Sequence, residues 1–402
     1  MARRVVISSF GVVSSLGSLE SSILASFKRG STAFTRTPLY PDLTVCPVEG
    51  FDPRAHTGRC KELRYLNRGA QLSVASAMDA LKNSGLARED WADAGLFAGT
   101  GPNLDITAEF PEIREGRLDS PGLQALWILK YLPNTAASLI SRLAGIRGEN
   151  LTVCTACAAT LQAIGEAFSR IKAGRLDLAL AGGGHSCINP GNLLAYKKAG
   201  ALYCGELEPA LAMRPFDSGR GGFVAAEGGA FFVLEEREHA LRRGAPILAE
   251  VCGYGCSLDA HGMTAPATGG ESGRAAVLKA LAEAEIPGDR IGLISAHATS
   301  TMLNDEAESV IIESIQGAGR PPVIALKSWT GHSAAACGAV ELALALVLMK
   351  NSLLPEIRNL KEPCSREIDF VTEQRSHEFS SLLLENFGFG GQNCALVVRR
   401  PQ

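Results

Sequence analysis

The sequence lacks a strong charge of either sign, and it is poor in aromatic residues. Its 402 residues carry 39 Lys and Arg against 42 Asp and Glu, a formal net charge of -3. The field of the whole molecule therefore attracts no polyanion, and we expect no nucleic-acid binding. Phe, Trp and Tyr make up only 6% of the chain, whereas glycine occurs 43 times. This composition predicts a core of Ala, Val, Leu and Ile with many close backbone approaches.

Signals for export, for disulfides and for membrane insertion are also weak. The apolar run near the start is interrupted by Ser8, Ser9 and Gly11, unlike a secretory signal peptide. No window approaches the roughly 18 apolar residues that a membrane-spanning helix needs. The 11 cysteines are odd in number and scattered from Cys46 to Cys394, which favours free thiols. We therefore expect a cytoplasmic protein without membrane contact.

Segments typical of strands and helices alternate along the chain, which predicts an α/β architecture. The length indicates two domains or one large pseudo-symmetric unit. Charged residues dominate 235–243, so we place the boundary there, giving halves of residues 1–244 and 245–402. Expected strands are 5–13, 94–100, 151–154, 176–181 (closed by the glycines at 182–184), 229–234, 291–297, 322–327 and 394–398. Expected helices are 19–27, 72–81, 161–171 and 333–349.

Cys157 is a candidate nucleophile. It lies in TVCTACAAT, where a predicted strand gives way to a helix, and a helix N-terminus stabilises a thiolate. Two other interpretations stay open. Cys157 is also compatible with a small buried apolar residue. With Cys154 it spells C-x-x-C, typical of a dithiol redox pair or half a zinc site, although no second C-x-x-C and no H-x3-5-H complete a metal set.

Two histidines follow predicted strands in the second half. His297 lies in SAHATSTMLNDEAE and His332 in KSWTGHSAAACGAVE. Side chains at strand ends converge in α/β proteins, and together with Cys157 these rings would polarise a thioester carbonyl. Either histidine alone is equally compatible with a solitary hydrogen-bonded residue. Cys157 and His332 each stand at a strand-to-helix junction, so two halves packed about a pseudo-twofold axis would bring them together.

Two further features accompany these residues. Lys327 closes the predicted strand before His332, and a buried charge there needs a carboxylate partner. The glycine-rich segment NFGFGGQN at 386–393 is either an ordinary loop or a source of backbone N–H groups for an oxyanion.

Taken together, these segments resemble the β-ketoacyl synthases of the elongating type, nearly from end to end. The resemblance rests on six stretches in the family's order: RRVVISSFGVVSSLGS, TACAAT, RPFDSGRGGFVAAEGG, HATST, KSWTGHSAAACGAVE and GFGG. It implies the thiolase fold, with two similar halves in five alternating αβαβα layers, normally dimeric. The second histidine distinguishes the elongating Cys-His-His enzymes from the initiating Cys-His-Asn type.

The resemblance also implies roles for individual residues. Cys157 would take an acyl group from the phosphopantetheine of an acyl carrier protein. His297 and His332 would donate hydrogen bonds to the thioester carbonyl of a malonyl-carrier as it loses carbon dioxide. The N–H groups of Cys157 and Phe389 would form an oxyanion hole, and the Phe389 ring would act as a gate.

Other positions are assigned by the resemblance alone. Thr299 and Thr301 match pantetheine contacts, and Glu308 and Lys327 match an ion pair behind the site. No cofactor or metal is implied beyond the carrier's phosphopantetheine. A basic stretch, Lys61, Arg64 and Arg68, would dock an acidic carrier protein, unless it is merely a solvated face.

Departures from the family pattern bear on pathway and partner. Ala298 and Gly221 stand where glycine and an acidic residue are usual, and Ala335 and Cys337 also differ. These changes favour polyketide or specialised fatty-acid biosynthesis. A homodimer and a heterodimer with a ketosynthase-like subunit are both compatible with the sequence. The alternative function is that of a non-catalytic partner that sets chain length.

Overall fold

Ten strands form two groups of five with the same order. The structure, a computed structural model, describes residues 3–106, 109–116, 123–267 and 269–401. The first group runs across the sheet as β5 (Asn150–Val153), β4 (Gly95–Gly99), β6 (Leu178–Ser186), β7 (Ala225–Glu236) and β1 (Val5–Val13). The second runs as β10 (Val323–Ile324), β9 (Ile294–Ser295), β13 (Ser381–Gly388), β14 (Gln392–Arg399) and β8 (Ala249–Leu258).

Strand directions repeat between the two groups. Each group begins at one edge with three parallel strands. In the first group β4 is parallel to its neighbours β5 and β6, and in the second group β9 is parallel to its neighbours β10 and β13. The other neighbours are antiparallel in both groups. The groups join where β1 pairs with β8. The other strands add to this pattern: β3 (Tyr40–Cys46) pairs with β7 and with β2 (Thr35–Thr37), and β11 (Leu353–Leu354) pairs with β12 (Arg375–Ser376).

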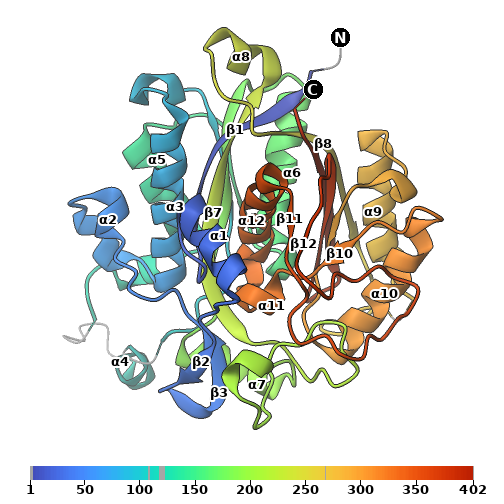
Figure 1. The fold of residues 1–402 in the computed structure, drawn as a ribbon. Coiled ribbons are helices and arrows are strands. Elements are labelled where there is room, and N and C mark those ends of the chain that lie inside the picture. The colour runs from blue at the N-terminus through green and yellow to red at the C-terminus, as the bar shows by residue number, and fades with distance from the viewer. Residues whose placement is uncertain (1–2, 107–108, 117–122, 268, 402) are drawn as a thin grey trace.

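Helices cover both groups and fill the space between them, which gives five alternating layers (Figure 1). The outer layer of the first group holds α3 (Arg68–Ser84) and α5 (Thr135–Ala144), and that of the second holds α9 (Glu271–Ala284) and α10 (Met302–Gln316). Between the sheets lie α6 (Ala159–Lys172) and α12 (Cys337–Asn351). The αβαβα arrangement expected from the sequence is confirmed. The remaining helices are α1 (Glu20–Arg29), α2 (Arg54–Thr57), α4 (Phe110–Glu115), α7 (Pro190–Lys198), α8 (Arg237–Arg242) and α11 (Lys327–Thr330).

The middle helix α12 is buried along almost its whole length. From Ala334 to Asn351 the chain has a mean hydropathy of 1.5, enough by length and composition to cross a membrane, and 89% of this window is buried inside the protein. The sequence-based statement that no window approaches such a length was therefore wrong. A helix packed between two sheets needs apolar residues on all sides, as a membrane helix does. The expectation of a helix buried on most sides is confirmed.

Several predicted elements differ at their ends. The glycines at 182–184 do not close β6, which continues to Ser186. A Cβ on Gly183 would lie 2.0 Å from the carbonyl oxygen of Gly99, so the glycine allows close strand packing rather than a turn. The glycine-rich segment 386–393 is not a single loop. Its first residues belong to the end of β13, and only residues 389–391 form the turn that leads into β14. Strands β8 and β13 and helices α9 and α10 were not predicted, since their small or mixed residues carry little periodicity.

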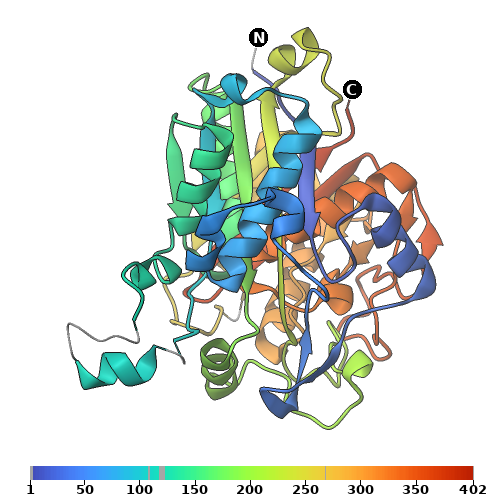
Figure 2. The same ribbon diagram turned by 90° about the vertical axis from the view of Figure 1, so that its left-hand side faces the viewer.

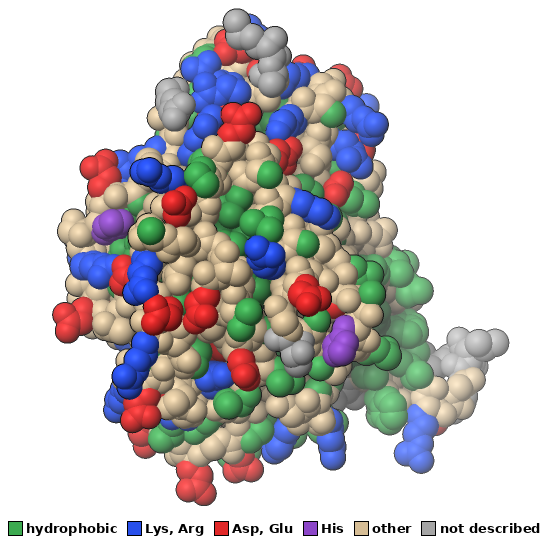
Figure 3. All heavy atoms as spheres, turned by 90° about the vertical axis from the view of Figure 1, so that its right-hand side faces the viewer, with side chains coloured by type: hydrophobic (Ala, Val, Ile, Leu, Met, Phe, Trp, Pro, Cys, Tyr) green, Lys and Arg blue, Asp and Glu red, His purple; other side chains and the backbone are tan. Residues whose placement is uncertain are grey.

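One segment extends from the body of the molecule. It contains α4 and stands clear of the sheets in Figure 2. Large apolar side chains are exposed along it and the following residues: Leu104, Ile106, Phe110, Ile113, Leu126, Ile128 and Leu132. On the face formed by α9 and α10, in contrast, basic and acidic side chains are interspersed, as the small net charge predicts (Figure 3).

The contact between β8 and α9 depends on glycine. A Cβ on Gly255 would lie 2.0 Å from the carbonyl oxygen of Ala276, a backbone atom that cannot turn aside. We expect Gly255→Ala to lower the free energy of unfolding by about 1–3 kcal/mol, because the helix must move to admit the methyl group. Gly221→Ala is the matched control, since a Cβ there meets only Tyr203 at 3.7 Å. Equal urea midpoints for the two variants would contradict this account.

Candidate active site

Cys157 lies at the junction between β5 and α6. It is the middle residue of a short 3-10 helix, Ala156–Ala158, that leads directly into α6. Ala156 has a φ of 48°, in the left-handed region that non-glycine residues adopt only at a cost. The residue is 9% exposed, and the backbone N–H groups of Phe389 and of Cys157 itself lie near enough to the sulfur to lower the pKa of the thiol. The sulfur therefore lies close to two backbone N–H groups.

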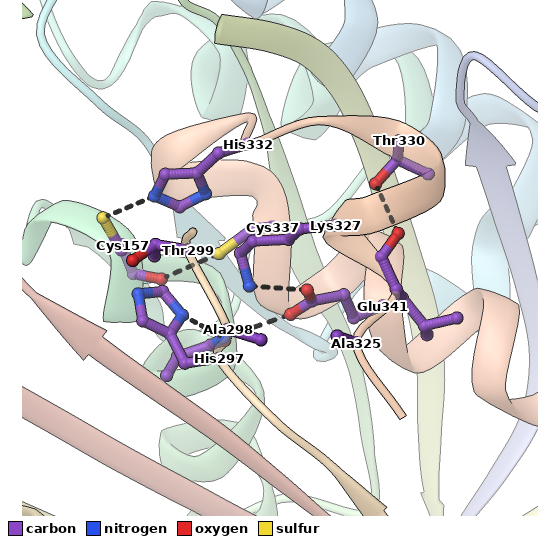
Figure 4. Close-up of polar contacts among 12 residues, drawn as sticks. Cys157, His297, Ala298, Thr299, Ala325, Lys327, Thr330, His332, Cys337 and Glu341 are labelled. Atoms are coloured by element: carbon purple, nitrogen blue, oxygen red, sulfur yellow. Dashed lines mark hydrogen bonds and ion pairs between the residues drawn. The ribbon is translucent and has the colours of Figure 1, made fainter. Parts of the chain in front are cut away.

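His332 lies at the corresponding junction before α12. Its backbone is anchored to the first half of the chain, since its N–H donates to the carbonyl of Val224 at 2.8 Å and its carbonyl accepts from Ala226 at 3.1 Å. A 3-10 helix, Ala334–Ala336, follows and leads into α12, with Ala334 at a φ of 44°. The ring Nε2 lies 3.2 Å from the Cys157 sulfur (Figure 4).

His297 completes the group. It follows β9, and its backbone N–H donates to Glu308 Oε1 at 2.5 Å, while the next N–H, of Ala298, donates to Glu308 Oε2 at 2.7 Å. The ring stands nearly perpendicular to that of His332, with centroids 5.4 Å apart. One Sγ and two ring nitrogens, from Cys157, His297 and His332, lie within 4.8 Å of one another. A single carbonyl group could contact all three.

Burial dominates the electrostatics of this group. It raises the pKa of the Cys157 thiol to about 11, and the nearby Lys327 ammonium and the N–H groups offset this only in part. Burial also lowers the pKa of His297 and of His332 well below the usual value, and the positive charge of Lys327 lowers both further. At neutral pH the resting site therefore holds a thiol and two uncharged imidazoles.

The expected partner of Lys327 requires a correction. The Lys327 ammonium pairs with Glu341 of α12, at 2.5 Å between Nζ and Oε1, and both side chains are fully buried. Glu308 is not its ion-pair partner, because its two oxygens accept the N–H groups of His297 and Ala298. Sequence reasoning missed Glu341, although it ends the quoted stretch KSWTGHSAAACGAVE and a buried lysine needs a carboxylate.

Asn386 was also missed. Its side-chain Nδ2 lies 3.2 Å from His297 Nδ1 and 3.1 Å from Glu341 Oε2, so it connects the ion pair to the histidine. The glycine-rich stretch around it was interpreted either as an ordinary loop or as a source of backbone N–H groups, and no local signal distinguished this asparagine.

A cavity of about 610 Å³ opens onto Cys157 and both histidines. Thr299 and Thr301 line it, with their hydroxyl oxygens 2.9 Å apart. Phe389 lines it too; its side chain is 37% exposed and its ring meets that of Tyr196 edge to face, with centroids 6.4 Å apart. The lining also includes Pro102, Leu104, Asn192 and Ala195.

The three basic residues expected to dock a carrier protein lie apart from this cavity's lining. Lys61 and Arg64 are exposed on the 3-10 helix Lys61–Tyr65 and border a surface hollow. Arg68 begins α3 instead, where it pairs with the buried Glu227 at 2.8 Å and stacks on Phe51. The three residues therefore do not lie on one helix, and Arg68 already forms an ion pair within the protein, with Glu227.

The C-x-x-C pattern is divided between two environments. Cys154 is exposed after β5, whereas Cys157 is buried beside the histidines, and both are free thiols. Burial raises the pKa of each thiol. Neither has the lowered pKa typical of a dithiol redox pair.

Family models match both halves of the chain. The β-ketoacyl synthase N-terminal domain matches residues 2–240, and the C-terminal domain matches residues 248–361. A 3-oxoacyl-[acyl-carrier-protein] synthase 2 of Vibrio cholerae is 32% identical, over 99% of each chain. A β-ketoacyl synthase from Burkholderia phymatum superposes with a TM-score of 0.92 at 32% identity, covering 100% of both chains.

Two solved structures from other systems are also similar. The ishigamide ketosynthase/chain length factor has a TM-score of 0.89 at 28% identity, over 100% of both chains. The ketosynthase of a type II polyketide synthase, AntDE, solved in complex with its acyl-carrier protein, has a TM-score of 0.87 at 26% identity, again over 100% of both chains. With the motifs, the five-layered fold and the Cys-His-His group, these matches establish that the chain belongs to the β-ketoacyl synthase family.

Proposed function

We propose that this chain is a catalytic β-ketoacyl-[acyl-carrier-protein] synthase. The observation that supports this most directly is the contact of 3.2 Å between the Cys157 sulfur and His332 Nε2, with His297 beside them. Cys157 takes an acyl group from a carrier-bound thioester and releases the carrier thiol. A malonyl-carrier then loses carbon dioxide, and the resulting carbanion attacks the acyl-cysteine to give a β-ketoacyl thioester and the free cysteine.

The protonation states of the thiol and of the two imidazoles indicate the role of each residue in the reaction. Because the thiol is protonated at rest, it must lose its proton as it attacks, and the neutral His332 Nε2 is the acceptor within reach. The backbone N–H groups of Cys157 and Phe389 lie near the sulfur and lower the pKa of the thiol, and we assign to them the oxyanion that forms on the carbonyl that Cys157 attacks. Uncharged imidazoles would donate hydrogen bonds to the enolate of the malonyl unit.

The cavity lining suits the two parts of the substrate. The hydroxyl groups of Thr299 and Thr301 suit the polar amides of pantetheine, and the apolar lining at Pro102, Leu104 and Ala195 suits an acyl chain. Phe389, which also lines the cavity, is the proposed gate. Gly221 also lines the cavity, and its missing side chain leaves space near Tyr203. This widened cavity favours polyketide or specialised fatty-acid biosynthesis.

The proposed partners are an acyl carrier protein and a second ketosynthase-like subunit, either another copy or a relative. Strand β5 is the edge strand of its group, with Leu151 37% exposed, and the exposed apolar residues of the α4 segment need a cover. The alternative function, a non-catalytic partner that sets chain length, needs no thiol, whereas here the thiol lies against a histidine.

Replacing the nucleophile separates the catalytic from the non-catalytic function. We expect Cys157→Ala to lower acyl transfer at least about 1000-fold, because among the described residues Cys157 is the thiol that is grouped with both histidines. Cys157→Gln should still decarboxylate the malonyl-carrier, since that step depends on His297 and His332. The measurement is intact mass after incubation with a panel of acyl-carriers, together with carbon dioxide release. An unmodified wild-type Cys157 with every donor would favour the non-catalytic function.

The raised pKa of the Cys157 thiol predicts a pH dependence. A thiol with a pKa of about 11 is almost wholly protonated at neutral pH, so its thiolate fraction rises with every unit of pH up to that value. We expect alkylation of Cys157 by iodoacetamide to rise about tenfold per pH unit from pH 7 to 9 without levelling off. Glutathione is the control, and peptide mapping isolates Cys157 from the other cysteines. A plateau below about pH 8 would contradict the resting thiol.

Carrier docking is tested by reversing charge at the two exposed basic residues. We expect Lys61→Glu with Arg64→Glu to raise the KM for a malonyl-carrier about tenfold at low salt and less at high salt, because screened surface charges steer the acidic partner. The rate with a small malonyl thioester should not change. Lys28→Glu with Arg29→Glu, exposed at the end of α1, is the matched control. Equal KM values in the two double variants would exclude this docking surface.

A further inference from the structure

Glu385 is a fully buried carboxyl group that the proposed mechanism does not use. It lies in β13, two residues before Phe387, and its side chain has a relative exposure of 0%. Neither of its oxygens meets an N–H or O–H donor among the described residues. An ionised carboxylate in such a place would be costly, so the group needs either a donor or a proton.

The carboxyl group of Glu308 lies close enough to that of Glu385 to raise its pKa. The strand register explains why. Leu384 of β13 pairs with Ser295 of β9, so Glu385 runs alongside the chain just before His297. Successive side chains of a strand point to opposite faces. Asn386 accordingly reaches the middle layer, where it contacts His297 and Glu341, and Glu385 reaches the outer layer, where Glu308 projects from α10.

Glu308 in turn holds the backbone of the His297 loop. Its two oxygens accept the N–H groups of His297 and Ala298, and the φ of 46° at Ala298 requires that the loop be held firmly. Two carboxyl groups in contact cannot both be ionised in an apolar layer, and one shared proton turns their repulsion into a hydrogen bond.

We propose that Glu385 is a positioning residue that carries a proton at neutral pH and donates it in a hydrogen bond to Glu308, which fixes the loop of His297. Glu385 touches no reacting atom. It acts through Glu308, and the pair carries one negative charge rather than two.

The surrounding charges are consistent with one shared proton. Burial raises the pKa of Glu385 well above its usual range, and the Glu308 charge raises it further. Burial raises the pKa of Glu308 to about 7, and Asp305 of α10 raises it too, whereas the backbone N–H groups of the His297 loop and Lys327 lower it. On the middle-layer side, Lys327 is neutralised by Glu341. Glu308 already accepts two backbone N–H groups, whereas Glu385 meets no donor among the described residues, so the proton has Glu385 as its favoured site and Glu308 as its acceptor.

Infrared spectroscopy tests the proton directly. Wild-type enzyme at pH 7.5 should show the carbonyl stretch of a protonated carboxylic acid, and Glu385→Gln should lose that band. Glu373→Gln, an exposed residue on the same segment of chain, is the matched control and should keep it. Absence of the band in the wild-type protein, or its persistence in Glu385→Gln, would overturn the proposal.

Unfolding supplies an independent measurement. A carboxyl whose pKa is raised by folding takes up a proton when the chain folds, so the wild type loses stability as pH rises above the ordinary glutamate value. Between pH 5 and 8 its unfolding equilibrium constant should rise, relative to that of Glu385→Gln, by up to about tenfold per pH unit. Parallel pH profiles for the two proteins would overturn the proposal.

The positioning role is tested by comparing two substitutions of similar volume in the Cys157→Gln background. Glu385→Gln keeps a hydrogen-bond donor and should retain decarboxylation within about twofold, whereas Glu385→Met, which has no donor, should lower kcat about tenfold with little change in KM. Equal rates in these two variants would overturn the positioning role. This arm alone rests on the proposed condensation activity; the infrared and unfolding measurements stand whatever reaction the site catalyses.

Discussion

The first turns of α6 and α12 lie against each other between the two sheets, and the site depends on that contact. The hydroxyl of Thr160 accepts the N–H of Ala339 at 3.0 Å, and the Cys337 thiol donates to the carbonyl of Cys157. Gly338 has no side chain because a Cβ there would lie 2.2 Å from Asn386 Oδ1 and 2.9 Å from Leu161. These small residues let the two helices approach closely, and Cys157 and His332, which precede them, are thereby brought within hydrogen-bonding distance.

The pseudo-symmetry of the sheets makes this contact possible. Each half places a strand, a 3-10 turn and a central helix in the same order, so the two turns face each other across the axis that relates the halves. In each turn an alanine, Ala156 or Ala334, takes a left-handed conformation. The strain at these positions is localised where the side chains must point into a shared cavity, as is common at functional sites. The two halves contribute different residues from near these turns: the thiol of Cys157 directly follows Ala156, and the imidazole of His332 precedes Ala334 by two residues.

Burial governs the chemistry of the site as it governs the packing. The same apolar surroundings that hold α12 in the middle layer keep the thiol protonated and both imidazoles uncharged. Lys327 retains its charge because Glu341 neutralises it in place. Polar groups on both faces of the second sheet are joined through β13, where Glu385 lies beside Glu308 on one face and its neighbour Asn386 contacts Glu341 on the other.

The sequence by itself determined the elements whose signals are local. Alternation and apolar runs predicted β1, α6 and α12, and the motifs around Cys157, His297 and His332 indicated the family and the chemistry. Tertiary structure alone decided which groups become partners. Lys327 pairs with Glu341 rather than Glu308, and Arg68 with Glu227, because a partner is set by the distance between elements far apart in the chain. The pairing of Glu385 with Glu308 has the same origin, since register and strand direction appear in no local pattern of residues.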